Sequence, residues 1–250
     1  MTVDSSSHAD PALVVLVHGA WHGAWCWATL QAELEGRGIP SFAVDLPGHG
    51  VSTSQLGGVL DDAAALVAVL DRLAAADSGP VVLIGHSYGG AVITQAAAGR
   101  DDVAHLVYVA AFALETGESV ISALGSFERR DVDLAAAMVP TTDGTATTLD
   151  PQTAAGALYG DCPEPPARAA LARLGPQTML SMTQPVDANG RQEIESTYVV
   201  CTRDRAVHPD HQATMAERCR HRVGLDTDHS PFISAVEPLA AIIGEIATSS

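Results

Sequence analysis

The sequence contains no lysine, and all 13 of its basic residues are arginine. Without a lysine amine, the chain cannot form a Schiff base with a carbonyl compound, which also removes the usual linkage to pyridoxal phosphate. A Walker-type phosphate loop requires a lysine as well. This single absence therefore excludes several classes of enzyme.

Positive charge is scarce in general, because 30 acidic residues face 13 basic ones and the formal net charge is -17 at pH 7. Nucleic acids and anionic membranes bind basic surfaces, so we expect neither as a partner. No apolar run approaches the roughly 18 residues of a membrane-spanning helix. The stretch 1–10 is polar and acidic where a secretory signal would be basic and then apolar, so we expect a cytoplasmic protein.

Cysteine is also rare, and the four cysteines show neither a Cys-x-x-Cys pair nor a metal-binding spacing. We expect them to be reduced thiols that fill the core. Two histidine pairs, His18 with His22 and His208 with His211, have spacings that can bind a metal, but neither has a third ligand at a suitable distance. The glycines of the loop 45–50 do not follow the dinucleotide-binding pattern. We therefore expect no metal and no cofactor.

The most informative stretch runs from Pro80 to Ile93. Its Val, Leu and Ile run predicts a buried strand, and the alanine-rich sequence that follows at 91–98 predicts a helix. Between them lies a Gly-x-Ser-x-Gly pattern centred on Ser87. A strand that turns into a helix so abruptly strains the serine backbone and lifts its hydroxyl above the sheet edge. An ordinary glycine-rich turn is the alternative, but the flanking strand and helix favour a nucleophile.

Strands and helices alternate on both sides of this stretch, and 250 residues suit one α/β domain. The pattern predicts a mostly parallel sheet of about six strands, with helices on both faces and the functional loops at the carboxyl ends of the strands. We expect residues 1–114 and 187–250 to form this core. The strands are expected at 12–17, 41–44, 81–84, 103–111, 197–202 and 222–225.

The alternation stops between residues 115 and 186, where Pro, Gly, Thr and Asp are scattered among short helical pieces without a strong strand signal. Some seventy residues are too many for a plain loop, so we expect an inserted cap. Its larger apolar residues either line a substrate pocket or pack the cap onto the body. The residues expected in the pocket are Trp21, Phe127, Tyr159 and Phe232.

A serine hydroxyl needs a base, and the base needs an orienting acid, in the chain order Ser, acid, His. His229 and Asp204 both follow predicted strands and so fall at the same sheet edge as Ser87. We expect His229 to take the serine proton and Asp204 to hold the imidazole tautomer. The rival acids are Asp228, Asp226 and Asp210. Asp228 adjoins His229 in sequence, so its carboxylate reaches the imidazole ring with difficulty.

The oxyanion formed during acyl transfer needs two donors that are in place before the reaction. One is expected to be the main-chain N–H of Tyr88, which follows the nucleophile. The other should come from the loop after the first strand, where Ala20 is the first choice and Trp21 the alternative. We expect the side chain of His18, in the same loop, to be structural.

Taken together, the motifs at 15–25 (VLVHGAWHGAW), 45–50 (DLPGHG), 85–90 (GHSYGG) and 204–232 resemble those of α/β hydrolases. The similarity is to the plant methylesterase and hydroxynitrile lyase-like group and its bacterial esterase relatives, and the segment 158–163 also resembles the bacterial members. The resemblance implies an α/β-hydrolase fold. Lyases of this group typically carry a lysine after the catalytic histidine and a threonine in the first oxyanion loop. Ser230 and Gly19 stand there, which favours hydrolysis.

These observations predict a serine hydrolase that cleaves a small to medium carboxylic ester through an acyl-enzyme, as a monomer or a homodimer. One alternative uses the same triad for lactone or thioester hydrolysis, acyl transfer, C–C cleavage or hydroxynitrile-lyase-like chemistry. Another is a ligand-binding receptor built on the hydrolase fold.

Overall fold

Six parallel strands form the central sheet of the computed structural model, which describes residues 10–250. Their order across the sheet is β2, β1, β3, β4, β8 and β9, and every neighbouring pair is parallel. All six carboxyl ends therefore lie at one edge. The strands are β1 (Leu13–Val17), β2 (Ser41–Val44), β3 (Val81–His86), β4 (Val103–Val109), β8 (Glu195–Cys201) and β9 (His221–Leu225).

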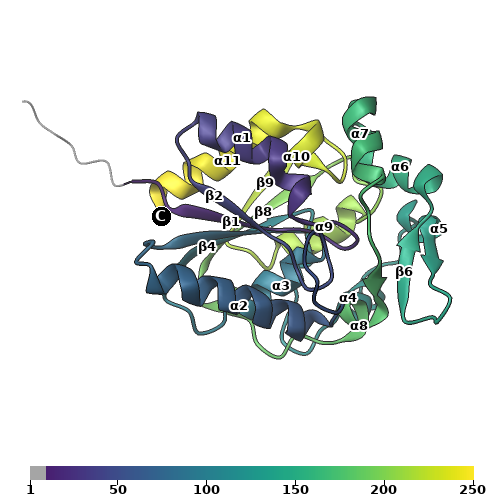
Figure 1. The fold of residues 1–250 in the computed structure, drawn as a ribbon, viewed down its shortest axis with the longest axis horizontal. Coiled ribbons are helices and arrows are strands. Elements are labelled where there is room, and N and C mark those ends of the chain that lie inside the picture. Colours follow the sequence, from purple (N-terminus) through teal and green to yellow (C-terminus); the bar gives the residue numbers. More distant parts are fainter. Residues whose placement is uncertain (1–9) are drawn as a thin grey trace, which may run out of the picture.

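Helices cover both faces of the sheet, as expected (Figure 1). One face carries α1 (Ala28–Gly36), which packs against α11 (Val236–Ser249). The other carries α2 (Val59–Ala75) and α3 (Gly89–Ala96), which pack on each other. The short α10 (Pro231–Ser234) precedes α11, and α9 (Pro209–Ala216) packs beside β8.

Strand β1 shows how the sequence creates two core layers. Its fully buried side chains alternate, so Val14 and Leu16 join the cluster beneath α1 and α11, while Val15 and Val17 join the cluster beneath α2 and α3. Burying an aliphatic side chain of this size stabilises the fold by about 1.5 to 3 kcal/mol. A strand that is apolar on both faces is typical of a parallel sheet covered by helices.

Some boundaries are set by local turns of the backbone. The expected strand 103–111 stops at Val109, because Ala110 has a φ of +47° and leaves the extended conformation. A 3-10 turn, Ala24–Trp27, precedes α1. A second 3-10 turn, Gly190–Gln192, leads into β8.

Residues 115–186 contain strands that the sequence did not predict. A three-stranded antiparallel sheet forms from β5 (Met138–Pro140), β6 (Ala146–Leu149) and β7 (Gln177–Thr178). Strands of two to four residues are too short to show a period, which is why the sequence carries no strong strand signal here. The helices are α4 (Val120–Ser126), α5 (Leu134–Ala137), α6 (Pro151–Tyr159), α7 (Glu164–Leu171) and α8 (Met179–Thr183).

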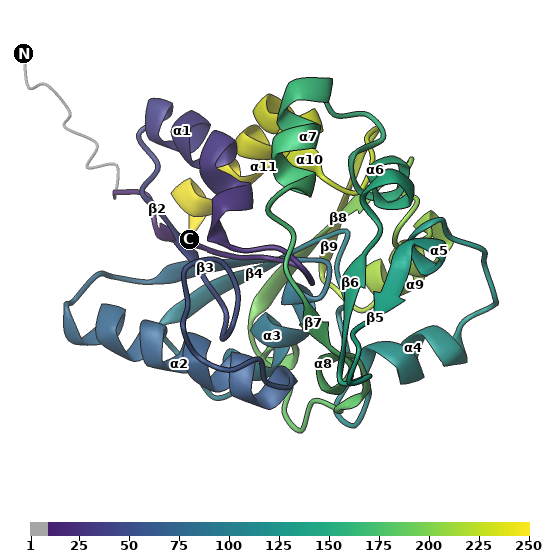
Figure 2. The same ribbon diagram turned by 45° about the vertical axis from the view of Figure 1, so that its right-hand side comes forward.

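This segment lies on the side of the molecule toward which the parallel strands run (Figure 1), and Figure 2 brings its small sheet forward. None of the helices in residues 10–250 has both the length and the apolar character that crossing a bilayer requires. Apart from Asp10, the N-terminal stretch that prompted the cytoplasmic expectation falls outside the described residues.

Candidate active site

Ser87 sits in the sharp turn between β3 and α3 and has a φ of +51°. A non-glycine residue keeps such a conformation only where its surroundings hold it. Its N–H donates to the Val109 carbonyl oxygen at 3.1 Å, and its own carbonyl oxygen accepts from the Phe112 N–H at 3.0 Å. The neighbouring strand β4 and the loop after it therefore fix the backbone of this serine.

The two glycines of the Gly-x-Ser-x-Gly pattern are required by close packing. A Cβ atom at Gly89 would lie 2.6 Å from the Val17 carbonyl oxygen, and one at Gly85 would lie 2.7 Å from the Gly89 carbonyl oxygen. Main-chain atoms cannot move away easily, so neither position accepts a side chain. This crowding brings α3 and the end of β1 close to Ser87.

His229 and Asp204, from the loops after β9 and β8, form a buried pair in which His229 Nδ1 lies 2.7 Å from Asp204 Oδ2. Asp204 Oδ1 accepts from the N–H groups of Ala206 and Val207, at 2.7 and 2.9 Å. Gln212 on α9 adds a bond from Nε2 to Oδ2 at 2.8 Å. These three donors thus orient the carboxylate toward the imidazole. No sequence motif indicated this role for Gln212.

The rival acids face other partners. Asp228 accepts from the Ser234 hydroxyl at 2.7 Å and from the Asp161 N–H at 2.9 Å, so its carboxylate ties the segment 115–186 to the body. The other two, Asp226 and Asp210, pair with arginines, the former with Arg203 at 3.2 Å and the latter with Arg130 at 2.7 Å.

Two main-chain N–H groups near Ser87 remain available. Within residues 10–250, neither the Ala20 N–H nor the Tyr88 N–H has a hydrogen-bond partner. The Trp21 N–H, in contrast, donates to Gln177 Oε1 at 3.1 Å. Of the two donors weighed for the first loop, Ala20 is therefore the one whose N–H is free to bind an oxyanion. Within the same described range, the Ser87 hydroxyl makes no hydrogen bond to His229, and such contacts often tighten only when substrate binds.

A cavity of about 230 Å³ opens beside Ser87, Ala20, Trp21 and Tyr88. Of the described residues that line it, none carries a formal charge. Helix α4, the β5 strand and helix α8 contribute much of this wall, which makes residues 115–186 part of the site. The apolar lining includes Phe112, Val120, Leu124, Met138, Met179 and Met182.

Three of the four residues expected in the pocket lie elsewhere. Phe232 is fully buried in the core, with its ring centroid 5.0 Å from that of Trp27. Tyr159 is buried between α6 and the first loop, where its hydroxyl lies 2.7 Å from His22 Nε2. Phe127 lies beside a neighbouring hollow, beneath the guanidinium of Arg218. The presence of an aromatic residue in the sequence does not reveal whether its side chain faces the cavity or the core.

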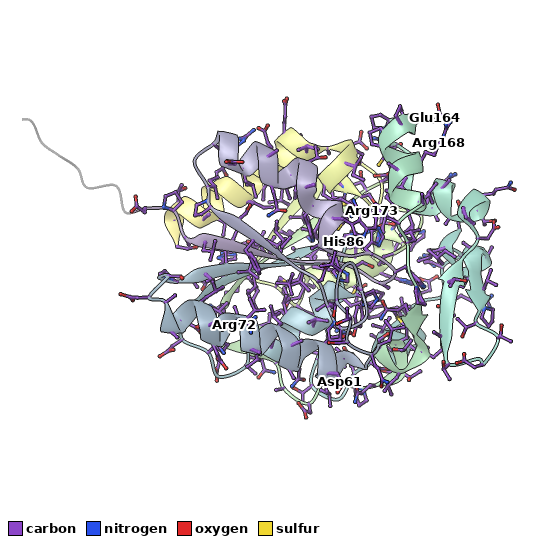
Figure 3. The ribbon with its side chains drawn as sticks, viewed as in Figure 1. Asp61, Arg72, His86, Glu164, Arg168 and Arg173 are labelled. Carbon is purple, nitrogen blue, oxygen red and sulfur yellow. The ribbon has the colours of Figure 1, made fainter. Side chains whose placement is uncertain are left out.

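His18, His22 and His86, three buried histidines beside the site, are neutral. Burial lowers the pKa of His18 to about 3 and that of His22 to about 4, and it lowers the pKa of His86 well below its ordinary value. His18 Nε2 accepts from the Leu46 N–H at 3.1 Å, so its ring ties two loops together. Figure 3 shows His86 in the middle of the molecule, next to the strands.

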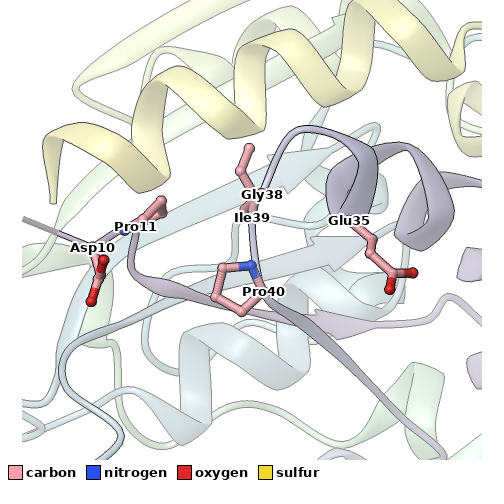
Figure 4. A pocket seen from close by; sticks show the side chains of 6 residues that line it. All are labelled: Asp10, Pro11, Glu35, Gly38, Ile39 and Pro40. Carbon is pink, nitrogen blue, oxygen red and sulfur yellow. The ribbon is translucent and has the colours of Figure 1, made fainter.

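The described part of the chain holds no cluster of three or more His, Cys, Asp or Glu side chains that could bind a metal. Burial also raises the pKa of the Cys26 and Cys201 thiols well above the ordinary value. A larger, open hollow of about 460 Å³ lies at the amino ends of β1 and β2 (Figure 4). It is far from Ser87 in the fold and has two carboxylates, Asp10 and Glu35, but no nucleophile.

Comparison with known proteins agrees with this fold. The sequence profile of the alpha/beta hydrolase family matches residues 14–242, so the chain belongs to that family. Methylesterase 7 of Arabidopsis thaliana is 31% identical over 248 residues, which cover 93% of this chain and 95% of that protein. Norfluorocurarine synthase 1 of a Strychnos species is 26% identical, with coverage of 93% and 94%.

Among solved structures, a pyrethroid hydrolase from Sphingobium faniae JZ-2 superposes with a TM-score of 0.81 at 25% identity. The match covers 94% of this chain and 97% of that one. The resemblance expected from the motifs is thereby confirmed, and the expected fold with it.

Proposed function

We propose that this α/β hydrolase is a carboxylic ester hydrolase that works through Ser87, His229 and Asp204. The observation that carries the proposal is the convergence, at one sheet edge, of a strained serine, a buried imidazole–carboxylate pair and two free N–H groups. The family match and the methylesterase and pyrethroid hydrolase relatives support ester cleavage.

In the proposed reaction, Ser87 Oγ attacks the ester carbonyl carbon while His229 Nε2 takes the hydroxyl proton. Asp204 keeps the proton of the neutral ring on Nδ1, and its negative charge stabilises the imidazolium. The N–H groups of Ala20 and Tyr88 bind the oxyanion. His229 then protonates the departing alcohol, and water, activated by the same ring, releases the acid from the acyl-enzyme.

Residues 115–186 act as a cap in this proposal, because α4, α5 and α8 contribute much of the cavity wall. An uncharged apolar lining disfavours a buried ionic group and suits a neutral, apolar acyl group. We therefore propose small to medium neutral carboxylic esters as substrates.

The test combines turnover with labelling of the nucleophile. The purified protein should release nitrophenol from a p-nitrophenyl ester with a burst equal to the amount of enzyme, if deacylation is slower than acylation. A fluorophosphonate should label the wild type rapidly and leave Ser87→Ala unlabelled. Tight, saturable ligand binding without turnover or labelling would instead identify a receptor.

A further inference from the structure

The loop that carries Ala20 is held under backbone strain. Trp21, the next residue, has a φ of +63°. A bulky side chain rarely adopts this conformation, which costs on the order of 1 to 3 kcal/mol and persists only where the surroundings impose it. The position of the Ala20 N–H therefore depends on whatever holds Trp21.

Four hydrogen bonds hold Trp21, and the three residues that make them all lie within 115–186. The Trp21 N–H donates to Gln177 Oε1 at 3.1 Å, and the indole Nε1–H donates to the Thr147 carbonyl and hydroxyl oxygens at 3.2 Å. The Trp21 carbonyl oxygen accepts from the Gly175 N–H at 2.8 Å. Strands β6 and β7, together with Gly175 just before β7, thus bind every polar group of the residue that follows Ala20.

The side chain of Gln177 is held in one orientation by its neighbours. Its side chain is fully buried, and its residue is fixed in β7 by pairing with Thr147 on β6. Oε1 also accepts from His49 Nε2 at 2.9 Å, while Nε2 donates to Ser181 Oγ at 2.8 Å. The amide is therefore locked with its oxygen toward Trp21. A buried N–H that lost this acceptor would be left unsatisfied, and the strained loop would relax.

We propose that Gln177 is a positioning residue for the oxyanion site, acting through Trp21 on the Ala20 N–H. This inference rests on the proposed ester hydrolysis. Oxyanion donors stabilise the transition state more than the bound substrate, so their displacement lowers kcat rather than raising KM. Gln177 itself touches neither substrate nor Ser87.

The experiment compares two substitutions of similar size. Gln177→Met removes both polar atoms, whereas Gln177→Glu keeps an acceptor for the Trp21 N–H. Loss of one oxyanion donor costs about 100- to 1,000-fold in kcat, so partial displacement in Gln177→Met should lower kcat by roughly 10- to 100-fold, with KM within about threefold of the wild type. Gln177→Glu should recover most of this loss. The pH profile of kcat/KM should not move, because His229 and Asp204 are untouched.

A matched control is Gln95→Met, because Gln95 Oε1 likewise accepts main-chain N–H groups, from Asp187 and Ala188 at 2.8 and 3.1 Å, but outside the site. Its kcat should stay at the wild-type value. Thermal unfolding establishes that each variant is folded at the assay temperature. If Gln177→Met is not folded at that temperature, Gln177→Asn replaces it. Its shorter side chain withdraws the acceptor from the Trp21 N–H, so the same loss of kcat is expected.

A folded Gln177→Met or Gln177→Asn with wild-type kcat would overturn the inference, as would a Gln177→Glu variant as slow as Gln177→Met. A wild-type protein without Ser87-dependent ester hydrolysis would instead refute the proposed function. The two failures are therefore distinguishable.

Discussion

His86 Nε2 donates a hydrogen bond to the main-chain carbonyl oxygen of His229 at 2.8 Å. The residue before the proposed nucleophile is thereby joined to the backbone of the proposed base. Because burial keeps the His86 ring neutral, one proton suffices for this bond, and its Nδ1 is left without a partner within residues 10–250. The contact ties the turn that carries Ser87 to the loop that carries His229.

The first prediction concerns the nucleophile and the base. Ser87→Ala and His229→Ala should each lower kcat for ester hydrolysis by roughly 10⁴-fold or more, and the double variant should be little slower than either. The two groups act in a single proton transfer, so removing one disables both. Steady-state kinetics on a p-nitrophenyl ester measure this, and more than about a tenth of wild-type activity in either variant would refute the assignment.

The second prediction ranks two neighbouring carboxylates. Asp204→Asn should slow turnover by about 10³- to 10⁴-fold, because the amide would favour the wrong imidazole tautomer. Asp228→Asn should slow it far less and chiefly lower the thermal unfolding midpoint, since Asp228 bonds the main chain at Asp161 and the Ser234 hydroxyl. The opposite kinetic ranking would make Asp228 the acid.

The third prediction concerns the acyl group. A p-nitrophenyl butyrate and a mono-p-nitrophenyl succinate are similar in size, but only the second carries a carboxylate. Burying that charge in an uncharged lining should lower kcat/KM for the succinate by about 100-fold or more. Alkaline hydrolysis of both esters serves as the reactivity control, and comparable enzymatic rates would show that the acyl group does not enter this cavity.

The fourth prediction concerns stability against pH. Asp62 on α2 is buried, its Oδ2 accepts from the Tyr88 hydroxyl at 2.5 Å, and its Oδ1 has no partner within the described residues. Burial raises the pKa of Asp62 from 3.8 to about 7. Between pH 4 and pH 7 this carboxyl group stays protonated in the folded protein but is ionised in the unfolded chain. The contribution of Asp62 to the stability of the fold therefore falls as pH rises from about 4 to about 7 and then levels off.

Asp62→Asn removes this titration. Its free energy of unfolding relative to the wild type should therefore rise between pH 4 and pH 7, by on the order of 4 kcal/mol at most. Urea unfolding at pH 4, 5.5, 7 and 8 measures the difference, and Asp61→Asn, at the neighbouring carboxylate, is the control. A pH-independent difference between Asp62→Asn and the wild type would contradict the prediction.

The fifth prediction concerns cyanohydrins. Their cleavage develops negative charge on cyanide and calls for a nearby cation, which this lysine-free chain does not offer in the cavity lining. Ser230 is fully buried where the lyases carry lysine, and Arg203 pairs with Asp161 and Asp226. We expect ester hydrolysis but no cyanide above background from mandelonitrile. Ser87-dependent cyanide release at a comparable rate would overturn the hydrolase assignment.

The sequence determined the parts of the protein that depend on neighbours along the chain. Alternating apolar runs and helical stretches predicted the six-stranded parallel sheet, which the structure confirms. The Gly-x-Ser-x-Gly turn located Ser87 because strand, bend and helix are all local. The same reasoning placed Asp204 and His229 at the ends of strands, since parallel strands share one carboxyl edge.

Only the tertiary structure decided which polar atoms meet. Asp204 rather than Asp228 faces the His229 ring. The Trp21 N–H is occupied because Gln177, which is 156 residues away in sequence, accepts it, and this leaves Ala20 as the free donor of the first loop within residues 10–250. The short strands that deliver Gln177 have no detectable period, and a lone buried glutamine has no motif. Hydrogen-bond partners and cavity walls arise from packing between distant segments, so no local pattern encodes them.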